Sequence, residues 1–249
     1  MSIVLFVFNR KGVKYMSKYA ENLVLIPGLN NTKQTWDGVV EALPKSINTF
    51  PVDVPAIANI DEIAKELLKD LPEKFHLVGH SFGGFVALAI LANAPERVSA
   101  LSLAGTNAEA DSEAGKEFRE KAIARVEAGE YEEMVNAAAH RTFHPDNLDN
   151  PKLQEIREQM LKDYGPERYI AHAKATMDRP DRNSLLADTD IPYLFIASPE
   201  DVVVPLESTK AMLKFAPNAE FKTIEKTGHL APLEQPEALA ELLLPWLEK

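Results

Sequence analysis

Short apolar runs alternate along this chain with segments in which an apolar residue recurs every three or four positions. Continuous apolar runs such as residues 23–26, which Pro27 and Gly28 end, are typical of buried parallel strands. The recurring segments predict amphipathic helices, and the clearest follows Asn59, which with Glu62 forms a plausible capping pair. Strands alternating with helices predict an α/β fold with a doubly wound, mostly parallel sheet. The expected strands are 23–26, 47–54, 75–78, 98–104, 191–197 and 219–224, and the expected helices are 35–43, 60–71, 82–94, 206–215 and 236–246.

The segment from about residue 111 to residue 188 interrupts this alternation. It contains no strand pattern, and we expect it to form an inserted helical cap over a site at the strand ends. Its four helical patterns lie at 114–129, 131–138, 153–164 and 166–177. Its larger apolar side chains are expected mostly to pack internally rather than to line the site: Phe118, Tyr131, Met134 and Met160. The predicted division is a leader or edge strand at 1–20, an α/β core at 21–110 and 189–249, and the cap at 111–188.

Composition and charge narrow the class of protein. The 249 residues carry a net charge of −11, which argues against a nucleic-acid or acidic-membrane binder, because both need clustered Lys and Arg. The absence of cysteine excludes disulfides, thiol catalysis and cysteine-ligated zinc. Residues 3–8 are apolar but too few to span a membrane, and basic residues follow them, opposite to the order in a signal peptide. We therefore expect a cytoplasmic protein that binds neither nucleic acid nor membranes.

A Gly-x-Ser-x-Gly pentapeptide, centred on Ser81, lies between a predicted strand and a predicted helix. A serine on such a sharp turn has a strained backbone, and glycines two positions to either side, Gly79 and Gly83, allow the chain to fold that tightly. The turn holds the hydroxyl above the sheet edge, beside the first N–H groups of the helix. We predict that Ser81 is an activated nucleophile and that Gly79 and Gly83 are structural turn residues.

A serine nucleophile needs a base within hydrogen-bond reach and an acid that orients this base. His229 follows the last predicted strand, where a loop can fold back over the serine, and we predict that it is the base. Asp201 follows the strand at 191–197 and is the predicted acid. Glu200 also qualifies chemically but is expected on the surface, and Asp111 is a weaker alternative.

Acyl transfer also needs N–H donors for the developing oxyanion. One should be the backbone N–H of Phe82, directly after the nucleophile. The other should be that of Leu29, because Gly28 lets the chain turn after the first core strand.

The other five histidines carry weaker patterns. The side chain of His80 should point away from the nucleophile, and His76 should pack within a strand. His140 and His144 have the spacing of a metal pair on a helix, but no third ligand is evident, so we expect no metal site. His172 is expected on the surface or in the cap.

The order Gly28, Ser81, Asp201, His229 resembles the α/β-hydrolase superfamily, as do the segments Gly-His-Ser-Phe-Gly-Gly and Gly-His-Leu-Ala-Pro-Leu-Glu-Gln-Pro-Glu. The resemblance covers roughly residues 22–248 and is strongest to compact bacterial esterases and enol-lactonase-like hydrolases with a helical cap. It implies a fold of eight strands in most members, no cofactor, and a Ser-His-Asp triad. This chain departs from many relatives in carrying Pro27-Gly28 where they have His-Gly. It also has few residues for the antiparallel strand pair with which relatives begin.

These features together predict a serine hydrolase that cleaves a small, largely uncharged carboxylic ester or lactone through an acyl-enzyme. The same fold and triad also serve C–C bond hydrolysis and cofactor-free perhydrolysis, and fold does not determine substrate. A non-catalytic ligand-binding protein on a hydrolase scaffold is the alternative from another class. The sequence leaves the oligomeric state open.

Overall fold

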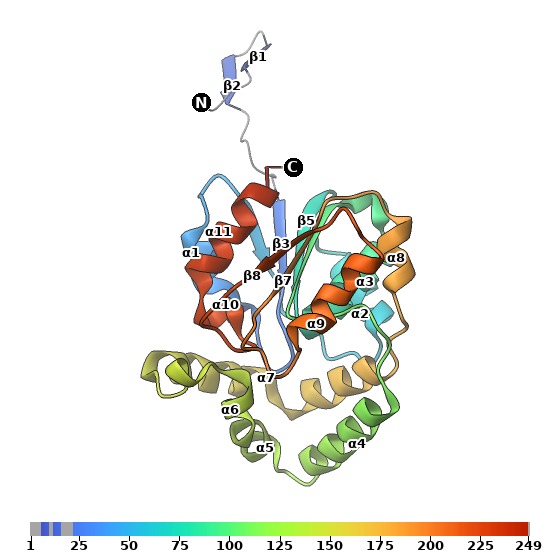
Figure 1. The fold of residues 1–249 in the computed structure, drawn as a ribbon, viewed down its shortest axis with the longest axis vertical. Helices are drawn as coiled ribbons and strands as arrows, with labels where there is room; N and C mark the ends of the chain where they lie inside the picture. Colours follow the sequence, from blue (N-terminus) through green and yellow to red (C-terminus); the bar gives the residue numbers. More distant parts are fainter. Residues whose placement is uncertain (1–5, 10–11, 16–21, 249) are drawn as a thin grey trace.

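A six-stranded parallel sheet forms the centre of the computed structural model, which describes residues 6–9, 12–15 and 22–248 (Figure 1). The strand order is β4-β3-β5-β6-β7-β8. Each expected strand is present, but β4 is shorter than expected because Pro51 ends it. The strands are β3 (Asn22–Ile26), β4 (Asn48–Pro51), β5 (Phe75–His80), β6 (Val98–Ala104), β7 (Tyr193–Ala197) and β8 (Glu220–Thr223).

Helices cover both faces of this sheet (Figure 1). On one face, α1 (Asp37–Ala42) and α11 (Pro236–Trp246) pack against β3 and β7 around the buried Trp36 and Trp246. On the other face, α2 (Ile60–Leu67) and α3 (Phe82–Asn93) bury their apolar residues with those of the sheet, near α9 (Leu206–Lys210). The side chain of Asn59 accepts hydrogen bonds from two backbone N–H groups of α2, as the capping pattern predicts. The doubly wound α/β prediction is thus confirmed.

The described N-terminal residues form a strand pair, whereas much of the leader or edge strand expected at 1–20 lies outside the described residues. Strands β1 (Phe6–Asn9) and β2 (Gly12–Tyr15) pair antiparallel with each other and make a two-stranded sheet of their own. Two residues separate them in sequence, so little chain entropy opposes their pairing. In the described part of the chain, no helix has the length and apolar character needed to cross a membrane.

The helical insertion between β6 and β7 lies at the carboxyl ends of the strands (Figure 1). Residues 153–164 and 166–177, expected as two helices, form two helical segments of α7 (Pro151–Met177), separated at Gly165. The backbone of Gly165 is not helical, with φ 76° and ψ 165°, so the first segment ends there and Pro166 starts the second. The other helices of the insertion are α4 (Glu113–Glu127), α5 (Tyr131–Ala137), α6 (Ala139–Thr142) and α8 (Asn183–Asp188).

The sheet register brings the segments that follow its strands to one edge. Ile26 of β3 pairs with Gly79 of β5, and His80 pairs with Ala104 of β6. Ala104 in turn pairs with Ile196 of β7. The loops after β3, β5 and β7 therefore leave the sheet side by side, beneath the helical insertion.

Candidate active site

Ser81 occupies the turn between β5 and α3 in a strained conformation, with φ 53° and ψ −120°. The glycines on either side of Ser81 allow neighbouring backbone segments to approach each other closely. A Cβ on Gly79 would lie 2.5 Å from the carbonyl oxygen of Gly83, and one on Gly83 would lie 2.3 Å from that of Ile26. No side chain fits at either position, so the turn can form only with glycine there.

The structure brings Ser81, His229 and Asp201 together in a hydrogen-bonded chain. The Nε2 atom of His229 lies 2.8 Å from Ser81 Oγ, and its Nδ1 atom lies 2.7 Å from Asp201 Oδ2. An ionised carboxylate only accepts hydrogen bonds, so Nδ1–H donates to Asp201 and Nε2 is left as the acceptor for the serine hydroxyl. This arrangement can remove a proton from Ser81 Oγ.

Asp201 is buried, and its surroundings keep the carboxylate ionised. Its other oxygen, Oδ1, accepts hydrogen bonds from the backbone N–H groups of Val203 and Val204 at 2.8 and 2.9 Å. Burial alone would raise the pKa of Asp201, but the hydrogen bonds from His229 and from these two N–H groups outweigh burial and hold the pKa below its ordinary value. The carboxylate can therefore stabilise an imidazolium at His229.

The two alternative acids have other partners. Glu200 is exposed and accepts a hydrogen bond from Ser198 Oγ at 3.0 Å. Asp111 lies 3.3 Å from Arg119 Nε and 3.4 Å from Arg179 Nη1 in ion pairs. Neither contacts His229, so the geometry favours Asp201.

Glu234, for which the sequence predicts no role, links the loop that carries His229 to the helical insertion through hydrogen bonds. Its buried Oε1 accepts hydrogen bonds from Gly228 N at 2.9 Å and from Thr227 Oγ1 at 3.1 Å. Its Oε2 accepts from His144 N at 2.8 Å and from Asn147 Nδ2 at 2.9 Å. The only sequence signal was its place in the family-like segment that begins at Gly228.

Two further hydrogen bonds hold the backbone of His229. The N–H of His229 donates to the carbonyl of Thr142 in α6 at 2.8 Å. Its carbonyl accepts a hydrogen bond from Nε2 of His80 at 2.7 Å. Burial lowers the pKa of His80 to about 3, so its ring is neutral and the second nitrogen, Nδ1, carries no proton. As expected, His80 is structural, and it supports the loop of the predicted base.

Two further histidines, His76 and His172, are buried in the protein interior. His76 contacts Trp246 edge-on within the core, as expected. His172, expected on the surface or in the cap, lies in the cap helix α7 and is fully buried. Its Nδ1 accepts from Tyr164 Oη at 2.6 Å, and its Nε2 donates to the carbonyl of Pro55 at 2.8 Å. These bonds satisfy the polar ring inside the insertion, which is why burial is tolerated.

His140 and His144 do not share a helix face. Helix α6 ends at Thr142, and His144 is extended, with ψ 143°. Pro145 disfavours a helical conformation at the residue before it. Over the described ranges, no three side chains of metal-ligand type come together.

The loop after β3 carries Gly28 and Leu29 and is called the oxyanion loop here, and it lies against the turn at Ser81. A Cβ on Gly28 would lie 3.1 Å from the Cβ of Ser81, so the loop that carries Leu29 passes close to the serine turn. Asn30 has a φ of 61°, a conformation that asparagine tolerates better than most residues. Its Oδ1 accepts a hydrogen bond from Tyr131 Oη at 3.1 Å, which fixes the loop to the insertion. Phe82 is the first residue of α3, where N–H groups have no helical partner.

A pocket of about 420 Å³ lies beside His229, between the oxyanion loop and the insertion. Phe118 and Met134 line it, whereas Tyr131 and Met160 pack internally. Met134 also packs against the apolar cluster of the insertion, so internal packing, expected for most of these four residues, holds for all but Phe118. The volume of this pocket is within the range of small-molecule sites. The lining residues are Leu29, Asn30, Asn31, Phe118, Arg119, Ala122, Met134, Val135, Ala138, Arg141, Thr142, Arg157, Leu161, Tyr169, Val203, His229 and Leu230.

Known proteins resemble this chain over most of its length. A putative carbamate hydrolase RutD from Yersinia enterocolitica is 24% identical over 93% of this chain and 88% of its own. A pimeloyl-[acyl-carrier protein] methyl ester esterase from Nitrosomonas europaea is 25% identical over 87% of this chain and 91% of its own.

Solved structures share the fold. A thermophilic esterase from Thermogutta terrifontis superposes with a TM-score of 0.84 at 27% identity, covering 91% of this chain and 89% of its own. The enol-lactonase from Burkholderia xenovorans gives 0.82 at 17% identity, covering 99% and 96%. The sequence profile described as "Alpha/beta hydrolase family" matches residues 23–242. The chain therefore belongs to the alpha/beta hydrolase family.

Proposed function

We propose that this protein is a serine hydrolase that cleaves small carboxylic esters or lactones through an acyl-enzyme. The single observation that carries the proposal is the continuous hydrogen-bonded chain from Ser81 Oγ through His229 to Asp201. The strained serine turn and the adjacent pocket support it. So do the names of relatives, among them a methyl ester esterase.

The proposed reaction has two halves. Ser81 Oγ loses its proton to His229 Nε2 and bonds to the substrate carbonyl carbon, and the oxyanion accepts hydrogen bonds from the N–H groups of Leu29 and Phe82. His229 then donates the proton to the leaving oxygen as the carbon–oxygen bond breaks, and an acyl-serine remains. Water, deprotonated by His229, attacks this ester and restores the free hydroxyl. Asp201 stays ionised throughout and stabilises the imidazolium.

The test is a turnover screen across p-nitrophenyl esters of increasing acyl length and several lactones. We expect hydrolysis of short and medium acyl chains, because a pocket of about 420 Å³ has room for such groups. No turnover of any ester or lactone by folded protein would contradict the proposal and favour a ligand-binding role.

A further inference from the structure

Three arginine side chains line the pocket beside His229: Arg119, Arg141 and Arg157. Among the described residues that form its wall, none is an aspartate or a glutamate. We propose that the pocket binds an oxyanion of the substrate, so that the preferred substrate is an ester or lactone bearing a carboxylate or phosphate at the end remote from the scissile bond. This inference rests on the proposed function and names its substrate class.

Arg157 is a buried cation bound only to neutral groups. It is 7% exposed, and its guanidinium donates to Asn136 Oδ1 at 2.8 Å and to the carbonyl of Val135 at 2.9 Å. Two neutral acceptors leave several of its five N–H donors unused. A buried charge is costly unless an opposite charge accompanies it; Glu158 acts on Arg157 electrostatically, but within the described ranges no carboxylate lies at ion-pair distance from it. An anion in the pocket would supply that partner.

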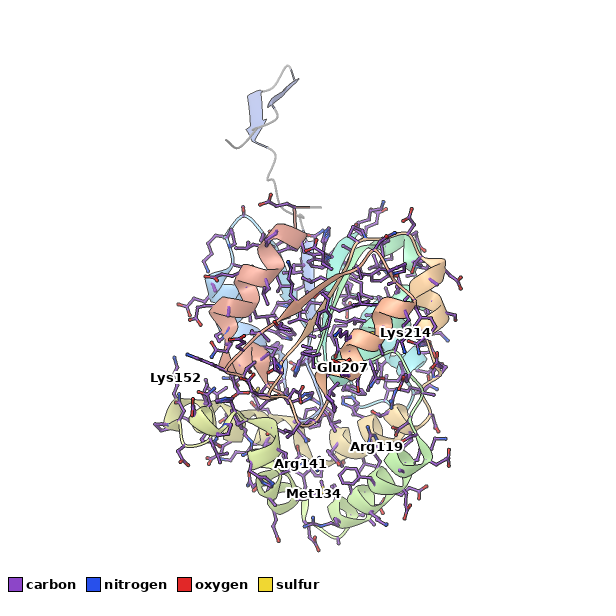
Figure 2. All side chains as sticks on the ribbon, viewed as in Figure 1. Arg119, Met134, Arg141, Lys152, Glu207 and Lys214 are labelled. Atoms are coloured by element: carbon purple, nitrogen blue, oxygen red, sulfur yellow. The ribbon has the colours of Figure 1, made fainter. Side chains whose placement is uncertain are left out.

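Arg141 stands at the exposed side of the same pocket. It precedes Thr142, whose carbonyl holds the N–H of His229, so its backbone is tied to the predicted base. For its guanidinium, too, the described part of the chain provides no carboxylate partner. Figure 2 shows Arg141 and Arg119 both in the helical insertion, together with Met134.

Arg119 adds further positive charge. Its carboxylate partner, Asp111, is shared with Arg179, so one negative charge is opposed by two positive charges. The whole chain carries a net charge of −11, and the substrate expected from the sequence is largely uncharged. That sum includes many surface carboxylates, none of which lies in the described pocket wall. The charge of the pocket wall, rather than that of the whole chain, acts on a bound substrate, and it is positive.

Arginine suits an oxyanion because its planar fork presents two parallel N–H donors to two oxygens. Carboxylates and phosphates share this geometry. With the scissile carbonyl at Ser81, an oxyanion several bonds away would reach into the arginine-lined part of the pocket.

The test compares two substrates of equal acyl length, p-nitrophenyl hydrogen adipate and p-nitrophenyl hexanoate. We expect kcat/KM for the adipate ester to exceed that for the hexanoate ester by about 10-fold or more, as for a charge-assisted hydrogen bond. Arg141→Gln and Arg157→Gln should each lower this ratio by about 10-fold. Arg157→Lys, which keeps the charge, should lower it less than Arg157→Gln does.

The control is Lys214→Gln, which removes an exposed positive charge beside the sheet, away from the insertion (Figure 2). It should leave the ratio unchanged. Arg141 is exposed, so its substitution tests the idea even where loss of Arg157 disturbs folding. A ratio near one in the wild-type protein, with hexanoate ester hydrolysed, would overturn the inference and leave the proposed function standing. Hydrolysis of neither ester would overturn both.

Competitive inhibition separates the two anions. Adipate and glycerol phosphate are compared with neutral adipamide as inhibitors of hexanoate ester hydrolysis. Stronger inhibition by adipate identifies a carboxylate site, and stronger inhibition by glycerol phosphate identifies a phosphate site. Either should weaken in Arg141→Gln. Equal inhibition by all three compounds would contradict an oxyanion site.

Discussion

Replacing Ser81 with alanine is expected to lower kcat for p-nitrophenyl acetate by about 10⁴-fold or more, to near the uncatalysed background. The reason is geometric. Only Ser81 Oγ lies within hydrogen-bond distance of His229 Nε2 among the described side chains, so its removal leaves the predicted base with no nucleophile. The oxyanion donors remain in Ser81→Ala and would account for any residual rate.

The matched control is Ser184→Ala, because Ser184 is exposed on α8. It should hydrolyse the ester at the wild-type rate. Ser81→Ala should also keep the wild-type circular dichroism spectrum, which shows that the loss is chemical. An undiminished rate in the folded Ser81→Ala protein would contradict the mechanism.

The second large effect expected is a loss of folding stability in mild acid. Burial lowers the pKa of His76 and His172 to about 4 and that of His80 to about 3. In the unfolded chain a histidine binds a proton below about pH 6.5. Between about pH 6.5 and pH 4 the unfolded state therefore holds more protons than the folded state, and the free energy of unfolding falls as the pH falls. At pH 5 each histidine should remove about 2 kcal/mol, or about 6 kcal/mol in all, relative to pH 7.5.

Asp201 does not offset this loss. Its pKa is lowered in the folded state, so its contribution is complete above about pH 4 and disappears only below that value. Urea unfolding at pH 5, 6, 7 and 7.5 measures the effect. His76→Gln should reduce the pH slope by about one third, because it removes one of three similar groups. His140→Gln, at an exposed position on α6, should not change it. Equal stability at pH 5 and pH 7.5 would show that these rings are not buried and neutral.

The triad candidates were predictable because each side chain follows a strand. The carboxyl ends of parallel strands lie at one edge of the sheet, so the Gly-x-Ser-x-Gly motif, chain order and strand position together located Ser81, Asp201 and His229. Helix α3 and strand β6 were equally readable from their apolar patterns.

The unpredicted features depend on contacts between distant segments. Glu234 has a role only because His144 and Asn147 of the insertion dock on the histidine loop, more than 80 positions away in sequence. The burial of His172 likewise depends on the carbonyl of Pro55. Hydrophobic periodicity describes one element at a time and contains no information about which elements meet. The arginine-lined pocket was missed for the same reason.

Covalent labelling with a fluorophosphonate probe tests the central claim most directly, because the probe reacts with a serine only when a base activates it. The structure predicts one adduct per chain, located at Ser81 by mass spectrometry of the digested protein, and slower labelling of His229→Gln. Absence of an adduct at Ser81 in the folded wild-type protein, or an adduct at another serine, would contradict the assignment of Ser81 as the activated nucleophile.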